Sequence, residues 1–281
     1  MTVLKTKAAL ENRRSGIPPG KQIGLVPTMG ALHQGHLALV KRALAENDYV
    51  FISIFVNPTQ FNNTDDLKKY PKTLEADVTL LNGLSTEIMV FAPSVEEIYA
   101  SNIQAKNYDF GPLETVMEGA FREGHFDGVG TIVETLFRLV KPHNAYFGEK
   151  DYQQLQIIKK MAAQRNLPVQ IVGCPIVREK GGLALSSRNE RLPKRLRKEA
   201  SFIYKTLLAA KKKFGTKSAG YVVNWVTSQF KKHKDLRLEY IEIAEAETLV
   251  TVKRKKKDIK YRAFIAVYAD DVRLIDNIAL N

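Results

Sequence analysis

Two histidines three residues apart, His33 and His36, are the residues of this chain whose types and spacing most directly suggest chemistry. They lie in the glycine-containing stretch 26–36, which follows the apolar run 23–26. Apolar residues at helical spacing come next, so the segment predicts a strand, a tight turn and a helix that begins at the histidines. Glycines let backbone N–H groups approach a ligand, and a helix N-terminus carries partial positive charge. Two imidazoles beside such a turn indicate chemistry at a phosphate.

Other polar clusters follow other predicted strands. Asn57 and Gln60 come after the apolar run 50–56, and their uncharged amides suit the hydroxyls and carboxylate of a small polar substrate. The polar run 148–151 follows a short strand, and the glycine-flanked loop 181–189 offers hydroxyls and a guanidinium, which suit a triphosphate. Because ligands of open α/β sheets bind beyond the carboxyl ends of the strands, these clusters are candidates for one site.

Each cluster also has a purely structural interpretation. Asn57 and Gln60 could cap the next element, and Asp151 could simply begin a helix. A lone histidine such as His125, in the loop 122–126, is often a hydrogen-bonded core residue. No third His or Cys lies near the histidine pair, which disfavours zinc. The chain has neither a Gly-x-x-x-x-Gly-Lys-Ser/Thr loop nor a Gly-x-Gly-x-x-Gly run, which disfavours P-loop phosphoryl transfer and ordinary dinucleotide binding.

The elements that must position these residues alternate between strand and helix in the first part of the chain. Strands are predicted over residues 23–26, 50–56, 87–91, 145–147 and 169–177, and helices over residues 67–81, 130–140 and 151–165. This alternation predicts an α/β fold, a Rossmann-like doubly wound parallel sheet, over residues 1–176.

The second part of the chain has a different pattern. Helices are predicted over residues 193–214 and 219–233, and strands over residues 238–243 and 261–268, with a lysine-rich turn between the strands. We therefore expect residues 177–281 to form a smaller, basic α+β domain that closes over the site.

Composition limits the class of protein. The chain has 281 residues, of which 44% are hydrophobic, so it can bury a sizeable core. Its one cysteine, Cys174, lies in an apolar run, which excludes an intrachain disulfide framework and fits a reducing compartment. No apolar run reaches the roughly 18 residues that span a bilayer. The sequence thus predicts a cytoplasmic protein with no membrane partner.

The net charge of +13 comes entirely from the second part. Residues 1–176 carry equal numbers of basic and acidic side chains, whereas residues 177–281 carry 25 Lys and Arg against 12 Asp and Glu. The lysine-rich runs 211–213 and 253–257 could contact nucleic acid, but no aromatic residues interleave with them as a stacking platform requires. A solvated surface explains the runs more simply, and we predict no nucleic-acid partner.

Several motifs together resemble one family. They are residues 27–36, 53–61, 70–71, 118–126, 147–151, 185–189 and 273–277. In these stretches the chain resembles the pantothenate synthetase (pantoate–β-alanine ligase) family, which belongs to the HIGH-type nucleotidyltransferase superfamily. The resemblance covers nearly the full length, and the combination of motifs is far more specific than any one of them.

The resemblance implies a two-step reaction. ATP and (R)-pantoate form pantoyl adenylate and pyrophosphate, and the amine of β-alanine then attacks the adenylate to give pantothenate and AMP. It also implies that Mg²⁺ accompanies the triphosphate and that the protein is a homodimer. No protein ligand of the metal is assigned.

The resemblance further implies roles for individual residues. His36 matches the proton donor, and the other groups expected to act on the phosphates are His33, Lys150, Ser186, Ser187 and Arg188. The residues that match ATP-binding positions are Met29, Gly30, Ala31, Leu32, His33, Gln34, Gly35, His36, Gly148, Glu149, Lys150, Asp151, Val177, Leu185, Ser186, Ser187 and Arg188. The residues that match the pocket for pantoate and β-alanine are Gln60, Gln154, Asn57, Arg122 and His125.

A few positions depart from the family pattern, among them Thr59, Ala100, Glu123 and Gly181, and none of them removes a proposed catalytic group. Two other functions are open at this stage. A related nucleotidyltransferase would transfer AMP or CMP to a phosphate, but such an acceptor favours Arg or Lys where this chain has amides. A nucleic-acid-binding protein would act through residues 177–281.

Overall fold

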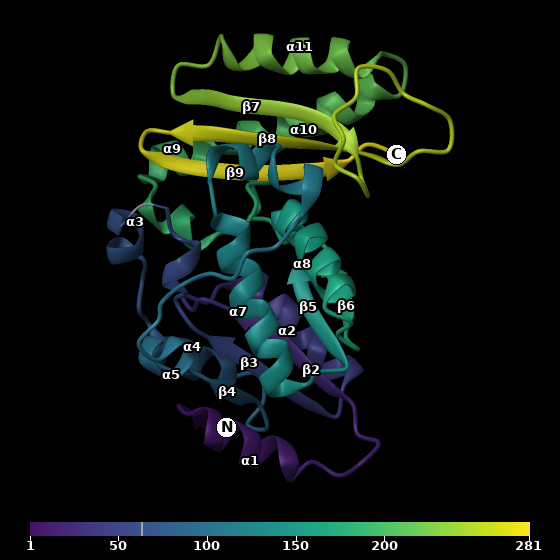
Figure 1. Ribbon diagram of the computed structural model, residues 1–281. Helices are drawn as coiled ribbons and strands as arrows, with labels where there is room; N and C mark the ends of the chain where they lie inside the picture. The colour runs from purple at the N-terminus through teal and green to yellow at the C-terminus, as the bar shows by residue number, and fades with distance from the viewer. Residues whose placement is uncertain (63) are drawn as a thin grey trace. The chain divides into compact units, whose positions relative to one another are not determined.

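The computed structural model describes residues 1–62 and 64–281 (Figure 1). The chain divides into two compact units. Unit 1 comprises Met1–Phe110, Phe121–Glu149 and Gln154–Pro175, and unit 2 comprises Gly111–Ala120, Lys150–Gln153 and Ile176–Asn281. The chain passes from unit 1 to unit 2 for the last time at 175/176, one residue before the single domain boundary that we expected at 176/177. That expected boundary leaves out two short earlier segments that belong to unit 2.

Unit 1 contains a six-stranded parallel sheet with the strand order β1-β4-β3-β2-β5-β6. Its strands are β1 (Thr2–Leu4), β2 (Ile23–Thr28), β3 (Tyr49–Ile54), β4 (Met89–Phe91), β5 (Asn144–Gly148) and β6 (Gln170–Cys174). The order reverses between β2 and β5, and ligands of such sheets bind beyond the strand ends at this switch point. The predicted fold class is confirmed, and the histidine pair lies at the start of the helix that follows β2.

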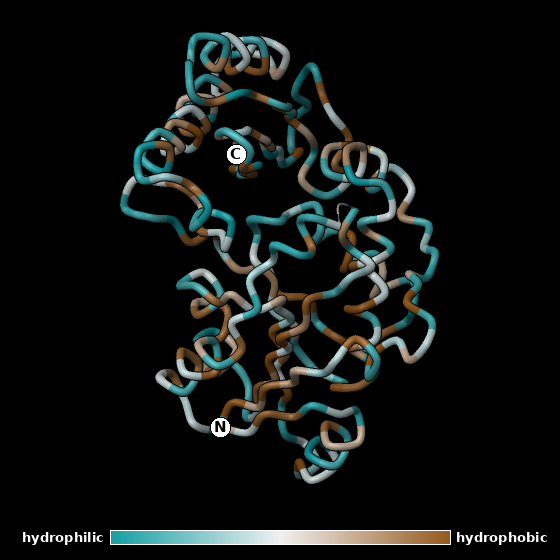
Figure 2. Tube along the Cα trace, turned by 90° about the vertical axis from the view of Figure 1, so that its left-hand side faces the viewer, coloured by the Kyte–Doolittle hydropathy of each residue, from teal (hydrophilic) through white to brown (hydrophobic). Residues whose placement is uncertain are grey.

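Helices cover both faces of this sheet. The longer helices of the first 175 residues are α1 (Lys7–Ser15), α2 (Gln34–Glu46), α4 (Leu74–Asn82), α7 (His125–Val140) and α8 (Tyr152–Gln164), and the short ones are α3 (Thr64–Lys69), α5 (Val95–Tyr99) and α6 (Met117–Phe121). Buried residues of α2 pack with Val26 and Tyr146, whereas Phe137 of α7 packs against Phe147. Neighbouring residues of a strand point to opposite faces, so α2 and α7 cover opposite faces. Figure 2 shows hydrophobic segments of the chain gathered in the interior of unit 1, as burial of both faces of the sheet requires.

Several predicted boundaries in unit 1 were wrong. The helix expected over 67–81 is two helices, because Pro71 cannot continue the first one. Helix α7 begins at His125, five residues earlier than expected, which places His125 at a helix start. The elements β1 and α1 were missed, since β1 has only three residues and α1 buries only Leu10.

Unit 2 is built on a three-stranded antiparallel sheet of order β7-β8-β9. Its strands are β7 (Leu236–Glu245), β8 (Tyr261–Ala269) and β9 (Val272–Ala279), and its helices include α9 (Lys194–Glu199), α10 (Ser201–Phe214) and α11 (Ala219–Phe230). The single helix expected over 193–214 is divided into α9 and α10 at Ala200. Strand β9 was not predicted, although its residues 273–277 had been singled out as a motif.

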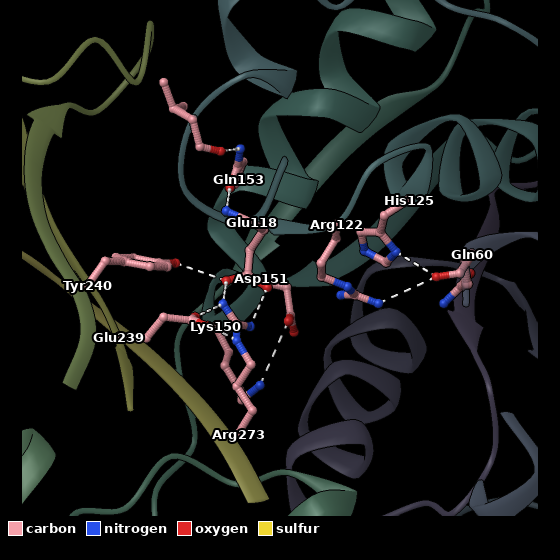
Figure 3. Close-up of polar contacts among 11 residues, drawn as sticks. Gln60, Glu118, Arg122, His125, Lys150, Asp151, Gln153, Glu239, Tyr240 and Arg273 are labelled. Atoms are coloured by element: carbon pink, nitrogen blue, oxygen red, sulfur yellow. Dashed lines mark hydrogen bonds and ion pairs between the residues drawn. The ribbon is translucent and has the colours of Figure 1, made fainter. Parts of the chain in front are cut away.

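A buried ion-pair network joins the early segment Gly111–Ala120 to the sheet of unit 2 (Figure 3). Arg273 of β9 donates two hydrogen bonds to the carboxylate of Glu118, at 2.7 and 2.8 Å, and the hydroxyl of Tyr240 donates a third at 2.9 Å. The side chain of Gln153 donates to the carbonyl groups of Leu113 and Val116 in the same segment. These long-range contacts explain why a sequence boundary alone could not define unit 2.

Two expectations from composition concern Cys174 and membrane spans. Cys174 is a free, buried cysteine, and burial raises the pKa of its thiol. Across the described ranges 1–62 and 64–281, no helix has the length and hydrophobicity that crossing a membrane requires. The predicted location in the cell stays a prediction.

The buried carboxylate of Glu134, on α7, is the centre of a second network of hydrogen bonds and ion pairs. It is 2% exposed and accepts hydrogen bonds from the Tyr108 hydroxyl at 2.6 Å and from Arg138 at 2.7–2.8 Å. Lys106 lies 3.2 Å from the same group. Burial opposes ionisation of Glu134, but the effect of these hydrogen bonds and charges is larger, so they lower its pKa to about 2. The network ties the segment around Tyr108 to α7.

We expect Glu134→Gln to reduce the free energy of unfolding at pH 7 by about 3 kcal/mol, the value linked to lowering a carboxyl pKa from about 4.3 to about 2. Because the folded-state pKa is depressed, this stabilisation is complete above the unfolded-state pKa and is lost as the pH falls toward 2. Urea unfolding at pH 7 and pH 3 measures it. The difference between the two proteins should roughly halve at pH 3, and a difference independent of pH would contradict this assignment.

Candidate active site

The turn after β2 is held by a buried carboxylate that sequence reasoning missed. Gly30 and Ala31 both have positive φ, 82° and 50°. The N–H groups of Ala31 and Leu32 donate to the carboxylate of Asp77, at 3.0 and 2.8 Å, and Asp77 is 3% exposed. A Cβ at position 30 would lie 3.0 Å from the same carboxylate. Asp77, from α4, therefore fixes the path of the chain into α2.

The two histidines cap α2, as the sequence predicted for the helix start. His33 is the N-cap residue, and its Nδ1 accepts a hydrogen bond from the Gly35 N–H at 3.1 Å. Nδ1 of His36 accepts from the His33 N–H at 3.3 Å, and the two ring centroids are 4.1 Å apart. A neutral imidazole that accepts through Nδ1 carries its proton on Nε2. The caps thus set two Nε2–H donors next to each other at the positive end of a helix.

Asn57, Gln60 and Met29 form one contact network at the ends of β2 and β3. Asn57 is 1% exposed, and its Nδ2 donates to Oε1 of Gln60 at 3.2 Å. Nε2 of Gln60 lies 2.9 Å from Sδ of Met29. Asn57 and Gln60, both predicted to line the acid pocket, are therefore in direct contact, and Gln60 also contacts a residue of the predicted ATP-binding turn.

His125 and Arg122 contact the backbone of Gln60 rather than its amide group (Figure 3). Nδ1 of His125 lies 2.8 Å from the carbonyl oxygen of Gln60, which can only accept, so Nδ1 carries the proton of this bond. Nη2 of Arg122 approaches the same oxygen at 3.4 Å. His125 is 5% exposed. Both residues hold Gln60 in position, a contribution that their predicted place in the pocket had not specified.

Unit 2 contains the residues predicted to hold the outer phosphates. Asp276 and Asn277 of β9 fix two of the segments on which these residues lie. Arg178 donates to both carboxylate oxygens of Asp276, at 2.6 and 2.9 Å, and to the carbonyl group of Gly182. The side chain of Asn277 donates to the carbonyl oxygen of Lys150 at 2.9 Å. Asp276 and Asn277 therefore position both Lys150 and the hairpin that precedes Ser186.

The serine loop begins a short helix. Ser186 caps the 3₁₀ helix Ser187–Arg191, and its hydroxyl accepts from the Arg188 N–H at 3.3 Å. The Leu185 N–H donates to the carbonyl oxygen of Val177 at 3.0 Å. These local hydrogen bonds fix the Ser186 hydroxyl and the backbone of the loop from Leu185 to Arg188.

The predicted site residues divide between the two units. Unit 1 holds the turn 29–36 with both histidines, the Asn57–Gln60 network with Arg122 and His125, the β5 end Gly148–Glu149, and Gln154 on α8. Unit 2 holds Lys150, Asp151, Val177 and residues 185–188. Within each unit, the contacts above bring together residues that are far apart in the sequence.

The chain matches the family described as Pantoate-beta-alanine ligase over residues 2–279. It belongs to this family. A pantothenate synthetase of Christiangramia forsetii is 59% identical over 262 residues, which cover 93% of each chain, and one of Flavobacterium psychrophilum is 56% identical over 92% of each.

Solved structures agree with this membership of the pantoate-beta-alanine ligase family. The crystal structure of pantothenate synthetase from Thermus thermophilus is 42% identical and superposes with a TM-score of 0.92, covering all of this chain and 99% of that one. A Francisella tularensis pantoate-beta-alanine ligase complexed with beta-gamma ATP and beta-alanine is 35% identical, with a TM-score of 0.81, and the match covers all of this chain and 98% of that one.

Asp77 provides a test of how this ligase-family turn is held. We expect Asp77→Asn to speed amide hydrogen exchange at Ala31 and Leu32 by about tenfold or more, because hydrogen bonds to a charged acceptor are worth about 1.5–3 kcal/mol. Mass spectrometry or NMR measures the exchange. Glu75→Gln, an exposed position on the same helix, is the matched control. Equal exchange in both variants would show that Asp77 does not hold the turn.

Proposed function

We propose that this chain condenses (R)-pantoate with β-alanine to pantothenate, using ATP and forming a pantoyl-adenylate intermediate. The observation that carries the proposal is the histidine pair that caps the start of α2 through its Nδ1 atoms. The chain that holds this pair matches the ligase family over residues 2–279. The Francisella tularensis relative complexed with beta-gamma ATP and beta-alanine supports two of the three substrates.

In the first step, a carboxylate oxygen of pantoate attacks the α-phosphorus of ATP. The new O–P bond replaces the bond from the α-phosphorus to the bridging oxygen, and pyrophosphate leaves with that electron pair. Negative charge builds on the phosphoryl oxygens and on the leaving group. The Nε2–H groups of His33 and His36 are suited to donate to these oxygens, with His36 as the proton donor.

In this proposal the groups that bind the acid directly are uncharged amides. Gln60 and Gln154 hold pantoate, Gln60 also lies beside β-alanine, and Asn57, Arg122 and His125 keep Gln60 in place. In the second step the β-alanine amine attacks the acyl carbon, a C–N bond forms, the C–O bond to AMP breaks, and the amine loses a proton. Because the adenylate is already reactive, holding the amine close is sufficient, and no nucleophilic side chain is required.

Unit 2 supplies the groups for the outer phosphates. Lys150, Ser186, Ser187 and Arg188 hold the β- and γ-phosphates, and the contacts of Asp276 and Asn277 support their placement. Closure of the domain of residues 177–281 would exclude water from the adenylate, which water would otherwise hydrolyse.

Mg²⁺ accompanies the triphosphate in this proposal. Among residues 1–62 and 64–281 no group of three His, Cys, Asp or Glu side chains could form a metal cage. We expect the ion to be held chiefly by phosphate oxygens and water, and we assign it no protein ligand. When bound, the ion neutralises phosphate charge.

We further propose a cytoplasmic homodimer that does not use nucleic acid as a partner. Part of each lysine-rich run has a structural role, which supports the absence of a nucleic-acid partner. Lys255 donates to the carbonyl groups of Phe214 and Gly215 at the end of α10, and Lys213 lies over the ring of Trp225, 4.7 Å from its centre.

Pantoate-dependent exchange between ATP and labelled pyrophosphate tests the reaction. We expect exchange only when pantoate is present, and pantothenate and AMP as products when β-alanine is added, identified by mass spectrometry. Exchange without pantoate, or no exchange with it, would contradict the proposal.

We expect His36→Ala to lower the exchange rate by about 10²–10³-fold, the loss of about 2.7–4 kcal/mol that follows from removing one preorganised donor. Circular dichroism checks that the fold persists. His233→Ala, which removes a histidine of unit 2 that has no part in the proposed site, should retain near-normal exchange. A fully active His36→Ala enzyme would refute the assigned role.

A further inference from the structure

The amide of Asn57 has only one compatible orientation. Its Nδ2 lies 3.0 Å from the carbonyl oxygen of Gly128, a group that accepts hydrogen bonds and cannot donate them. The backbone of α7 comes this close because residue 128 is glycine: a Cβ there would lie 2.3 Å from the carbonyl oxygen of Thr59. The nitrogen of Asn57 therefore faces α7, and its oxygen faces away.

Two hydroxyl groups meet the oxygen of Asn57. The Tyr99 hydroxyl, at the end of α5, donates to Oδ1 at 2.6 Å, and the Thr59 hydroxyl lies 3.1 Å from the same atom. Burial raises the pKa of Tyr99, so the phenol keeps the proton that it donates. Both contacts reinforce the orientation that the Gly128 carbonyl dictates.

This orientation passes to Gln60. The second N–H of Asn57 Nδ2 points to Oε1 of Gln60 at 3.2 Å, which turns the oxygen of Gln60 toward Asn57 and its Nε2 toward Met29. The thioether sulfur of Met29 is a weak acceptor, and an acid oxygen is a much stronger one. Gln60 is 9% exposed, and its carbonyl oxygen is held by His125, so the residue is fixed at both ends.

We propose that Tyr99 and Asn57 are positioning residues that orient the Gln60 amide so that Nε2–H, and not Oε1, meets the acid substrate. The inference rests on the proposed function, in which Gln60 binds pantoate. It makes the subsite selective for an acid that presents an acceptor oxygen to Gln60. It also assigns a function to Tyr99, which lies outside every motif considered above.

The test measures the KM for pantoate and kcat in the exchange assay. We expect Tyr99→Phe, which retains the ring and removes one hydrogen bond, to raise the KM about threefold to tenfold and to change kcat less than twofold. Tyr108→Phe removes another partly buried tyrosine hydroxyl, one bonded to Glu134, and is the matched control. It should leave the KM unchanged, and an equal rise in the control would overturn the proposal.

Asn57→Asp provides a second test. A carboxylate at position 57 cannot donate to Oε1 of Gln60, so the amide turns and presents Oε1 to the acid. We expect the KM for pantoate to rise by more than about 30-fold, because an acceptor then faces an acceptor. A KM within threefold of the parent enzyme would contradict the inference.

A double-mutant cycle separates positioning from a general structural effect. If Tyr99 acts through Gln60, Tyr99→Phe should not raise the KM further in a Gln60→Ala background. Additive effects would show that Tyr99 does not act through Gln60, and would leave the proposed function intact. A Gln60→Ala enzyme with an unchanged KM would overturn both the positioning by Tyr99 and the role of Gln60 in binding pantoate. No pantoate-dependent exchange in the parent enzyme would overturn the proposed function itself.

Discussion

The geometry of the site depends on the carboxylate of Asp77, which satisfies two backbone N–H groups at the end of β2. Where a chain passes from a buried strand to a helix within a few residues, backbone N–H groups of the turn have no partner in either element and must find another acceptor. Asp77 provides these partners for Ala31 and Leu32, and the path that it fixes ends in the His33 cap. Without that path, the two imidazoles would have no defined position at the start of α2.

The two units hold the residues of the proposed site by different physical chemistry. In the proposed acid subsite, the contacts of Asn57 form a network of neutral amides and hydroxyls, in which an acceptor-only carbonyl group determines the direction of each later hydrogen bond. The segments of unit 2 are held mainly by charge, through pairs such as Arg178–Asp276 and Arg273–Glu118. Neutral groups discriminate between substrates by donor and acceptor direction, whereas charged pairs hold segments that are distant in the sequence.

The basic surplus of residues 177–281 is partly explained by the structure. Arg195 pairs with Asp235, Arg197 pairs with Glu179, and Lys255 caps the end of α10. A charge count could not distinguish these local roles from a surface for nucleic acid, since both place lysines and arginines in the same part of the sequence.

The sequence by itself determined what depends on local spacing. Hydrophobic periodicity predicted the α/β class and most elements of the sheet. The spacing of His33 and His36 predicted that both lie at the start of one helix, because neighbours along a helix are set by local geometry. Only the tertiary structure decided the rest. Asp77 reaches the turn from 46 residues away, and Gly128 orients Asn57 from 71 residues away. Such partners depend on the order of strands and the packing of α4 and α7, which no local pattern encodes.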